Sequence, residues 1–282
     1  MQRKHNVPLS SLTTFQNEGI VQEVVIVENE AELCEWLHKG ETFYILGKGS
    51  NTVINPNGKI QRFLQISPQW CDPSVTGNLL TVGAGTTVNT LMKLLVTHGL
   101  SGLEFSAGVP ASVGGMVAMN FGCWGQEISD TVIQVKVVSK EGQSQWLSKK
   151  DCEFGYRTSR FQSQNEIITE VQFQLEQQDP NIIKSNQRHF IDQRLAKQPL
   201  REKTFGSTFK NPSGYFAGAL IEQIGFKGKP VGAVMFSTRH ANFLVNGGGG
   251  TFQEVETLIK TVQEKVSEQF QIQLETEVKL VQ

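Results

Sequence analysis

A short polar stretch, residues 204–217, carries three side chains whose types and spacing suit chemistry on a small ligand. Ser207 follows a glycine and precedes Lys210 and Asn211. The glycine lets the backbone turn without a Cβ penalty, and the proline after Asn211 ends any regular ladder because it lacks an N–H. We therefore expect the three side chains on the edge of a tight loop. The same residue types build ordinary turns, so a plain turn is the alternative.

A second candidate lies where an apolar strand, expected at Phe43–Leu46, runs into the sequence Gly-Lys-Gly-Ser-Asn at 47–51. Such a turn exposes backbone N–H groups without side-chain bulk, as phosphate-binding loops do. It lacks the third glycine and the following helix of the dinucleotide-binding fingerprint. A phosphate-binding loop and a plain β-turn both remain open.

A third candidate is the run 102–125, which is rich in glycine and other small residues and contains few charges. A chain so poor in side-chain volume packs its backbone closely against a neighbouring element or against a large flat ligand. Together with the turn at 47–51, the run would suit the phosphates and the ring system of a dinucleotide. Close packing of a helix on a strand is the alternative.

Two arginines, Arg157 and Arg160, lie in the insert "FGYRTSRF" between strands expected at Val132–Val138 and Ile167–Leu175. A guanidinium group offers a fixed, permanently charged fork that suits a carboxylate and can also stabilise an enolate. The alternative is a pair of ordinary surface arginines.

The elements that must position these residues follow from capping signals and periodicity. Helices are expected after three capping residues that precede apolar residues at helical spacing: Asn29, Thr87 and Thr251. A polar helix is expected at 186–198 and a short amphipathic one at 216–228. Strands are expected at Ile20–Val27 and Leu79–Val82, and the alternation from Ile272 to Leu280 predicts a final strand.

The composition excludes several classes of function. The hydrophobic share of 38% and the charged share of 19% are typical of a soluble globular protein. A net charge of −1 provides no electrostatic footprint for nucleic acid or an anionic membrane. No run of eighteen apolar residues occurs, so we expect a cytoplasmic protein. The scattered cysteines and histidines predict neither a disulfide framework nor a metal site.

Taken together, these stretches resemble the UDP-N-acetylenolpyruvoylglucosamine reductase family, also called UDP-N-acetylmuramate dehydrogenase, of bacterial peptidoglycan synthesis. The matching pieces follow the family's order and cover the chain from Phe43 to its end: "ILGKGSNTVI", "GLEFSAGVPASVGGMVAMNFGCWGQEISD", "FGYRTSRF", "GSTFKNP", "STRHANFLVN" and "LETEV".

The resemblance implies an α+β flavoprotein of three domains. The first two would hold FAD in the manner of the vanillyl-alcohol oxidase and p-cresol methylhydroxylase superfamily, as residues 1–68 with the final strand 271–282 and as residues 69–198. The third, 199–270, would bind the substrate. The implied reaction uses NADPH and FAD to reduce UDP-N-acetylenolpyruvoylglucosamine to UDP-N-acetylmuramate, a step that serves the cell wall, cell shape and cell division. The implied partner is this small molecule, with no nucleic acid and no membrane, and a monomer is expected.

The resemblance also assigns roles to single residues. Ser207 would donate a proton to the substrate, with Arg157 and Glu277 as its catalytic partners. Arg157 would stabilise the enolate only when it forms, and Glu277 is expected to be protonated, so that it donates a hydrogen bond instead of repelling the enolate. Substrate contacts are expected from Asn211, Lys210 and Lys279. Flavin contacts are expected from Gly47, Gly49, Ser50, Asn51, Ala107, Gly108, Ser112, Gly114, Gly115 and Gly122.

The chain departs from the family pattern at a few points. The N-terminal stretch lacks the usual Gly-Gly-Ala-like piece, Lys48 replaces a residue that is often glycine, and Lys279 stands where arginine is typical. A lysine lacks the bidentate fork and would weaken the grip on a carboxylate. The short spacing between Arg157 and Ser207 indicates the subclass without the inserted tyrosine-bearing loop, so no tyrosine is given a role.

Three other functions are compatible with parts of the sequence. Another FAD oxidase or dehydrogenase of the same superfamily would leave "GSTFKNP" and "LETEV" unexplained. A serine hydrolase using Ser207 with His240 and Asp192 would lack the G-x-S-x-G nucleophile elbow. A flavin- or nucleotide-binding module without catalysis is disfavoured because Ser207, Arg157 and Glu277 are all present.

Overall fold

The computed structural model describes residues 1–163 and 165–282, and these residues divide into two compact units. The first consists of Met1–Lys4, Val24–Gly47 and Arg62–Gln193, and the second of His5–Glu23, Lys48–Gln61 and Arg194–Gln282. The expected division into three domains stays a prediction, because a grouping of the chain into compact units does not test it.

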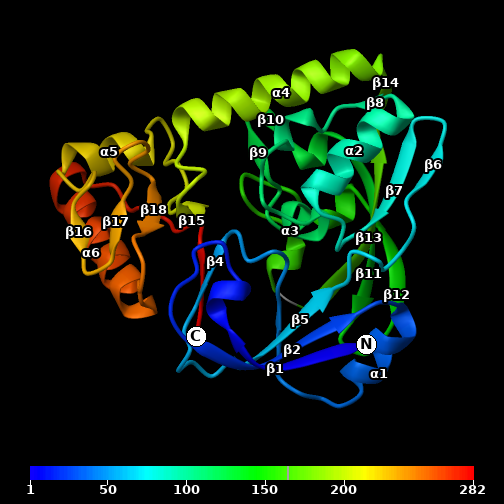
Figure 1. Ribbon diagram of the computed structural model, residues 1–282, viewed down its shortest axis with the longest axis horizontal. Helices are drawn as coiled ribbons and strands as arrows, with labels where there is room; N and C mark the ends of the chain where they lie inside the picture. The colour runs from blue at the N-terminus through cyan, green and yellow to red at the C-terminus, as the bar shows by residue number, and fades with distance from the viewer. Residues whose placement is uncertain (164) are drawn as a thin grey trace. The chain divides into compact units, whose positions relative to one another are not determined.

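The larger sheet of the first unit is antiparallel and has the strand order β12-β11-β13-β7-β6 (Figure 1). Its strands are β6 (Ser74–Thr76), β7 (Leu79–Gly83), β11 (Val132–Ser139), β12 (Ser144–Ser148) and β13 (Glu166–Gln174). The helices α2 (Val88–His98) and α3 (Val113–Ala118) share one apolar core with this sheet, and α3 packs against β7 and β13. Since α3 is part of the glycine-rich run 102–125, this packing brings the run against the sheet.

A second sheet has the order β1-β2-β5-β3. Helix α1 shares an apolar core with residues of β2 and β5 from this sheet. The elements are β1 (Gln2–Pro8), β2 (Ile20–Val27), α1 (Glu30–Leu37), β3 (Tyr44–Ile45) and β5 (Arg62–Ile66). Smaller elements complete the description: β8 (Leu100–Ser101) pairs with β14 (Glu176–Gln177), β9 (Gly122–Cys123) pairs with β10 (Gln126–Glu127), and α4 spans Pro180–Lys197.

The second unit is built on an antiparallel sheet of order β15-β18-β17-β16, whose core includes residues of α5 and α6 (Figure 1). The elements are β15 (Lys203–Ser207), α5 (Ala217–Gln223), β16 (Pro230–Val231), β17 (Val234–Phe236), β18 (Phe243–Asn246) and α6 (Phe252–Phe270). The short strands β4 (Thr52–Ile54) and β19 (Lys279–Val281) pair in parallel within the same unit.

The predicted helix starts are confirmed, since Asn29, Thr87 and Thr251 cap α1, α2 and α6 through their side chains. The strand at Ile20–Val27 has the predicted bounds. Helix α4 begins at Pro180, six residues earlier than 186. The signal was present, because Asp179 accepts a hydrogen bond from the Asn181 N–H at 2.7 Å and proline suits the first helical position.

The prediction of a strand from Ile272 to Leu280 is wrong in extent, because only Lys279–Val281 forms β19. Its partner β4 is three residues long, and the preceding tail makes only an isolated bridge, between Thr276 and Phe209. The alternation nevertheless buries Leu274 and Val278 in the core of the second unit. The alternation of apolar residues therefore predicted which side chains are buried, but not which residues pair as a strand.

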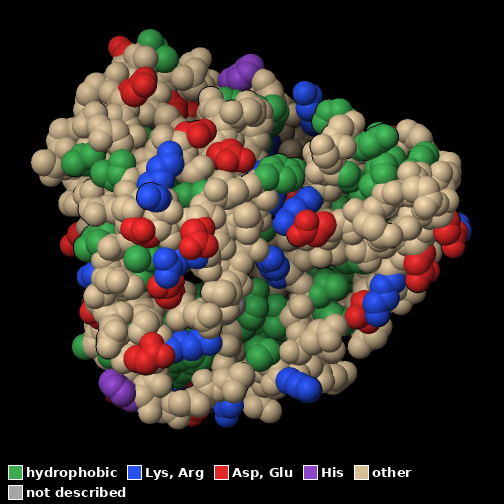
Figure 2. Space-filling view, turned by 180° about the vertical axis from the view of Figure 1, so that it is seen from behind, with side chains coloured by type: hydrophobic (Ala, Val, Ile, Leu, Met, Phe, Trp, Pro, Cys, Tyr) green, Lys and Arg blue, Asp and Glu red, His purple; other side chains and the backbone are tan. Residues whose placement is uncertain are grey.

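Acidic and basic side chains are interspersed over the face shown in Figure 2, in keeping with the small net charge. Within residues 1–163 and 165–282 we find no helix with the length and apolar character needed to cross a bilayer. The same residues contain no group of three or more His, Cys, Asp or Glu side chains arranged to hold a metal ion.

Candidate active site

Arg157 occupies a strained position at the tip of a tight turn in the first unit. Gly155 and Thr158 exchange two backbone hydrogen bonds of 3.1 Å across the turn, and Arg157 has a φ of +55°. Type II turns need a positive φ at this third position, which glycine usually supplies. An arginine in the left-handed region carries a conformational cost, and such outliers concentrate at functional sites.

The guanidinium group of Arg157 is held against the glycine-rich run. Its Nη2 donates a hydrogen bond to the Gly122 carbonyl, and its Cζ lies 5.1 Å from the centre of the Tyr156 ring. A Cβ at Gly122 would lie 2.7 Å from the Gln126 carbonyl oxygen and 3.2 Å from Arg157 Nη1. Gly122 therefore permits both the β9–β10 hairpin and the close approach of the arginine.

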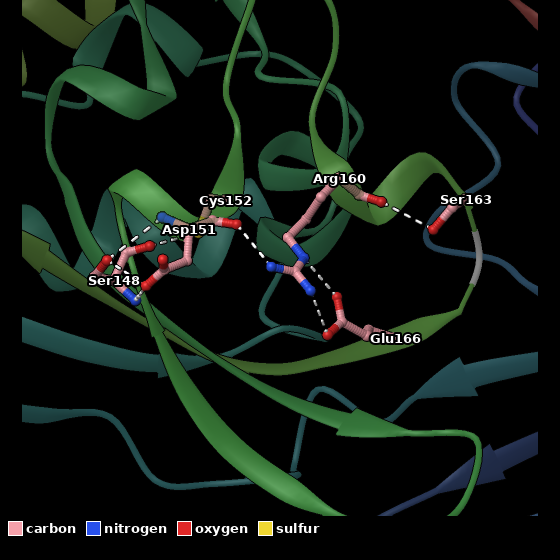
Figure 3. Close-up of polar contacts among 6 residues, drawn as sticks. All are labelled: Ser148, Asp151, Cys152, Arg160, Ser163 and Glu166. Carbon is pink, nitrogen blue, oxygen red and sulfur yellow. Dashed lines mark hydrogen bonds and ion pairs between the residues drawn. The ribbon is translucent and has the colours of Figure 1, made fainter.

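Arg160 has a different task, which Figure 3 shows. Its guanidinium binds both carboxylate oxygens of Glu166, at 2.8 and 2.9 Å, and donates to the Asp151 carbonyl at 3.0 Å. Asp151 in turn accepts a hydrogen bond of 2.5 Å from the Ser148 hydroxyl. This bidentate clamp ties the end of the arginine insert to the start of β13. The structure thus separates the two arginines of the insert into a fixed clamp and a candidate functional group.

Gly47, Ser112 and Gly115 lie together at the start of α3. A Cβ at Gly47 would lie 2.7 Å from Ser112 Oγ, which caps α3 by accepting a hydrogen bond from the Gly115 N–H. The amide of Gln65 donates to the Gly47 carbonyl at 2.9 Å and holds the turn in place. The first N–H groups of α3 are already bonded within the protein, since Val113 donates to the Thr86 carbonyl at 2.9 Å, Gly114 to the Ala84 carbonyl at 2.8 Å and Gly115 to Ser112 Oγ. Gly47 brings no side-chain bulk to this point, as a bound pyrophosphate would require, and the flavin role of Gly47, Ser112 and Gly115 stays a prediction.

The other flavin candidates of the first unit differ in their surroundings. Ala107 is fully buried in the core around α2 and α3, whereas Gly108 is exposed with a φ of +83°. A Cβ at Gly114 would lie 2.8 Å from the Ala84 side chain, so this glycine lets α3 pack against the end of β7. Close packing, one of the two alternatives left open by the sequence, therefore accounts for Gly114, whereas the flavin role of Ala107 and Gly108 stays a prediction.

Gly49, Ser50 and Asn51 belong to the second unit. Gly49 has a φ of +63°, and a Cβ there would lie 2.2 Å from the Leu12 carbonyl oxygen, so its own backbone packing requires glycine. The Asn51 amide donates to the Glu277 carbonyl at 3.0 Å, and its carbonyl accepts from the Lys279 N–H. Asn51 thus positions the C-terminal residues, and the flavin role of these three residues stays a prediction.

Ser207 lies at the end of β15, half-buried, next to a disruption of the strand pairing between Thr204 and Ser207. Gly206 has a φ of +82°, which directs the chain out of the regular ladder. The buried side chain of Asn242 accepts from the Phe209 N–H at 3.0 Å and donates to the Phe209 carbonyl at 2.8 Å. The segment that follows Ser207 is therefore fixed by two hydrogen bonds to one asparagine.

The C-terminal tail runs beside this segment. The Glu277 N–H donates to the Thr208 carbonyl at 2.9 Å, which places Glu277 next to the residue that follows Ser207. Lys210 Nζ lies 2.6 Å from a Glu275 carboxylate oxygen. Burial lowers the pKa of Lys279, and the neighbouring charge of Lys210 lowers it further, while the nearby carboxylates oppose both effects.

Asn211 has a structural contact as well as its predicted substrate role. Its side-chain oxygen accepts a hydrogen bond of 3.0 Å from the Ala217 N–H, which opens α5. The side chain thereby links the loop after Ser207 to the start of that helix.

Each unit thus brings together part of the predicted set. The first gathers Arg157 with Gly122, and Gly47 with Ser112 and Gly115. The second gathers Ser207, Glu277, Lys279, Lys210 and Asn51. Sequence reasoning gave no role to two buried asparagines, Asn120 and Asn242, which fix the backbone around Arg157 and Ser207. Both lie inside the stretches that carried the resemblance. Each is a polar side chain among small or apolar residues, and this pattern could have indicated a buried asparagine that bonds to the backbone.

Two family models match the chain. The model described as the FAD binding domain matches residues 21–148, and the one described as UDP-N-acetylenolpyruvoylglucosamine reductase, C-terminal domain, matches residues 198–281. The first match and the structural likeness below confirm the predictions of FAD as cofactor and of an α+β flavoprotein.

Curated relatives and a solved structure are similar over nearly the whole chain. A UDP-N-acetylenolpyruvoylglucosamine reductase of Limosilactobacillus fermentum is 36% identical over 99% of this chain and 94% of the relative. One of Clostridium botulinum is 37% identical over 97% of this chain and 90% of the relative. The crystal structure of the UDP-N-acetylenolpyruvylglucosamine reductase of Thermus caldophilus has a TM-score of 0.85 and 32% identity, covering 100% of this chain and 98% of that one.

Proposed function

Because the chain belongs to the UDP-N-acetylenolpyruvoylglucosamine reductase family and is an FAD-dependent oxidoreductase, we propose that it reduces UDP-N-acetylenolpyruvoylglucosamine to UDP-N-acetylmuramate with NADPH. The observation that supports this substrate is the match of residues 198–281 to the reductase's own C-terminal domain, rather than to the FAD-binding region alone. If the protein were another flavin oxidase of the superfamily, the match of residues 198–281 to the reductase's C-terminal domain would be unexplained.

When bound, FAD supplies a hydride acceptor for NADPH and a hydride donor for the terminal vinyl carbon of the substrate. Gly47, Gly49, Ser50 and Asn51 are proposed to hold its pyrophosphate, since the two glycines bring no side-chain bulk to this turn. Further flavin contacts are proposed for Ala107, Gly108, Ser112, Gly114, Gly115 and Gly122.

Arg157 is proposed to stabilise the negative charge of the enolate that forms when the vinyl carbon receives a hydride. Its cation is already held in place by the Gly122 carbonyl and the Tyr156 ring, so little reorganisation accompanies the reaction. The hydride forms a C–H bond at the vinyl carbon, and the π electrons move onto the adjacent carbon and the carboxylate. The fixed guanidinium group stabilises this state more than the ground state, and the step is accelerated.

Ser207 is proposed to complete the reaction by giving its hydroxyl proton to the adjacent carbon, so that the double bond gains one hydride and one proton. Serine is a weak acid, and its proton moves only to a strongly basic acceptor such as an enolate in a dry site. Glu277, fixed beside Thr208, is proposed to act as a neutral hydrogen-bond donor. Lys210, Lys279 and Asn211 are proposed to bind the charged and polar groups of the substrate.

Visible absorption spectroscopy of the purified FAD-loaded protein tests this function. Under anaerobic conditions, NADPH should bleach the flavin band, and UDP-N-acetylenolpyruvoylglucosamine should restore it. A band that NADPH bleaches but the enolpyruvyl sugar does not restore would refute the proposed substrate.

The Ser207→Ala variant tests the proton donor. It should be reduced by NADPH at nearly the wild-type rate, while its reoxidation by substrate should be slower by several orders of magnitude. An equal loss in both half-reactions would contradict the proposed role of Ser207.

We further propose that the protein acts in the cytoplasm, where nucleotide sugars and NADPH occur, and as a monomer. Light scattering on the eluted protein would test its mass against 31.3 kDa.

A further inference from the structure

We infer that Asn120 and Gln162 are positioning residues that hold the Arg157 turn in its strained conformation and thereby set the rate of hydride transfer to the substrate. The inference rests on the proposed role of Arg157 and goes beyond it, because neither side chain is assigned to substrate or cofactor.

Asn120 joins three parts of the first unit through one buried side chain. It is 1% exposed, and its amide nitrogen donates to the Gly155 carbonyl at 2.9 Å and to a Glu127 carboxylate oxygen at 2.8 Å. Its side-chain oxygen accepts from the Ser129 N–H at 3.2 Å. Gly155 is the first residue of the Arg157 turn. Asn120 therefore anchors that turn to the end of α3 and to the segment after the β9–β10 hairpin.

Asn120 also has a φ of +40°, so its own backbone lies in the left-handed region. Asparagine tolerates this region better than most residues, but the conformation persists only where contacts over-determine it. Two left-handed residues thus meet across the hydrogen bond from Asn120 to the turn of Arg157. The cost of both is offset by the same network.

Gln162 holds the other side of the turn. Its amide nitrogen donates to the Arg157 carbonyl at 2.8 Å and lies 3.3 Å from the Ala118 carbonyl. The neighbouring Ser159 hydroxyl donates to the same Ala118 carbonyl at 2.7 Å. The carbonyls of Gly155 and Arg157 therefore each accept a hydrogen bond from one of the two amides, and Gln162 also contacts Ala118, the last residue of α3.

The physical consequence concerns where the guanidinium group can be. Electrostatic stabilisation of a developing charge depends on groups that are oriented before the reaction, and a displacement of about 1 Å can cost about 100-fold in rate. Without the hydrogen bonds of Asn120 and Gln162, the turn should relax to a negative φ at Arg157, because arginine is strained at a position where glycine is usual. The guanidinium group then leaves its place beside Gly122.

The first experiment compares two variants with a matched control. Asn120→Gly keeps the left-handed backbone, since glycine adopts it freely, and removes only the side chain. Gln162→Met removes the amide at similar side-chain length. Gln172→Met is the control, because Gln172 is likewise half-buried in the first unit and bonds through its amide to Gln134 and Thr81, outside the turn.

Anaerobic stopped-flow measurements on the FAD-loaded variants give the result. Asn120→Gly and Gln162→Met should slow flavin reoxidation by substrate about 10- to 100-fold. Their FAD content, their rate of reduction by NADPH and the substrate concentration for half-saturation should stay within about twofold of wild type, as should all properties of Gln172→Met. Loss of FAD from Asn120→Gly, or equal slowing of both half-reactions, would overturn the inference in favour of a general structural role.

A double-mutant cycle with Arg157→Ala decides whether the two residues act through the arginine. In that background, Asn120→Gly and Gln162→Met should change reoxidation less than twofold, because the group that they position is absent. Multiplicative effects would refute the inference while leaving the proposed function intact. If Arg157→Ala itself reoxidises at the wild-type rate, the proposed role of Arg157 fails instead.

Discussion

Replacing Arg157 by glycine and by alanine separates the stability of its turn from its function. Both substitutions remove the guanidinium group, its hydrogen bond to Gly122 and its contact with the Tyr156 ring. These losses cancel when the two variants are compared with each other. What differs is the backbone at a φ of +55°, which alanine adopts with strain and glycine without it.

The magnitude follows from two opposing terms. Holding an L-residue in the left-handed region costs about 1–2 kcal/mol. The opposing term is the greater flexibility of the unfolded chain with glycine, which lowers the stability of the glycine variant by about 0.4–1 kcal/mol relative to alanine. Arg157→Gly should therefore be more stable to unfolding than Arg157→Ala by about 0–1.6 kcal/mol, with a central value of about 0.8 kcal/mol.

Urea denaturation of the two FAD-loaded variants, followed by flavin fluorescence and circular dichroism, measures this difference. Flavin reoxidation by the enolpyruvyl sugar should be slowed equally in both, by about 100- to 1,000-fold, as expected for the loss of one charge-stabilising group. Arg157→Lys should lie between them and wild type, because it keeps the charge but loses the fork. An alanine variant more stable than the glycine variant would refute the left-handed turn in solution.

Three further predictions concern the second unit. Asn242→Ala leaves the buried N–H and carbonyl of Phe209 without their partner and should cost about 2–6 kcal/mol in unfolding free energy, which urea denaturation would measure. Lys279 has a pKa below the ordinary 10.5, so it loses its charge at a lower pH than an ordinary lysine does. The Michaelis constant for the sugar should therefore increase at alkaline pH in wild type but not in Lys279→Arg. Identical pH dependence of the Michaelis constant in the two proteins would exclude substrate binding by the charge of Lys279. Burial lowers the pKa of His240, whose neutral Nδ1 accepts from the Asn242 N–H. The folded state therefore resists protonation, and stability present above pH 6.5 should be lost as the pH falls through the lowered pKa, a loss that His240→Gln should lack.

Much of the local structure was predictable because its causes lie within a few residues. The caps at Asn29, Thr87 and Thr251 each bond an N–H three residues ahead, and the apolar period of the following helix is visible in the same window. The family, and with it FAD and the identity of the candidate catalytic residues, followed from six short stretches in a specific order. These features require no knowledge of which distant segments meet.

The final strand shows where such reasoning ends. Alternation from Ile272 to Leu280 predicted a long strand, but pairing needs a partner, and β4 offers only Thr52–Ile54. The period could report which side chains are buried and could not report the length of a strand far away in the sequence. The same limit applied to Arg157 and Arg160, which look alike in "FGYRTSRF".

The sequence by itself therefore determined the family, the cofactor, the helix starts and the residue types available for chemistry. Only the tertiary structure decided that Arg160 is bound to Glu166 while Arg157 occupies a left-handed turn, and that Asn120 and Asn242 bond to the backbone of the segments that carry Arg157 and Ser207. The hydrogen bonds that make these assignments join residues 35 and 33 positions apart in the chain. Contacts at that separation depend on the whole fold, whereas caps and periods depend on the nearest neighbours.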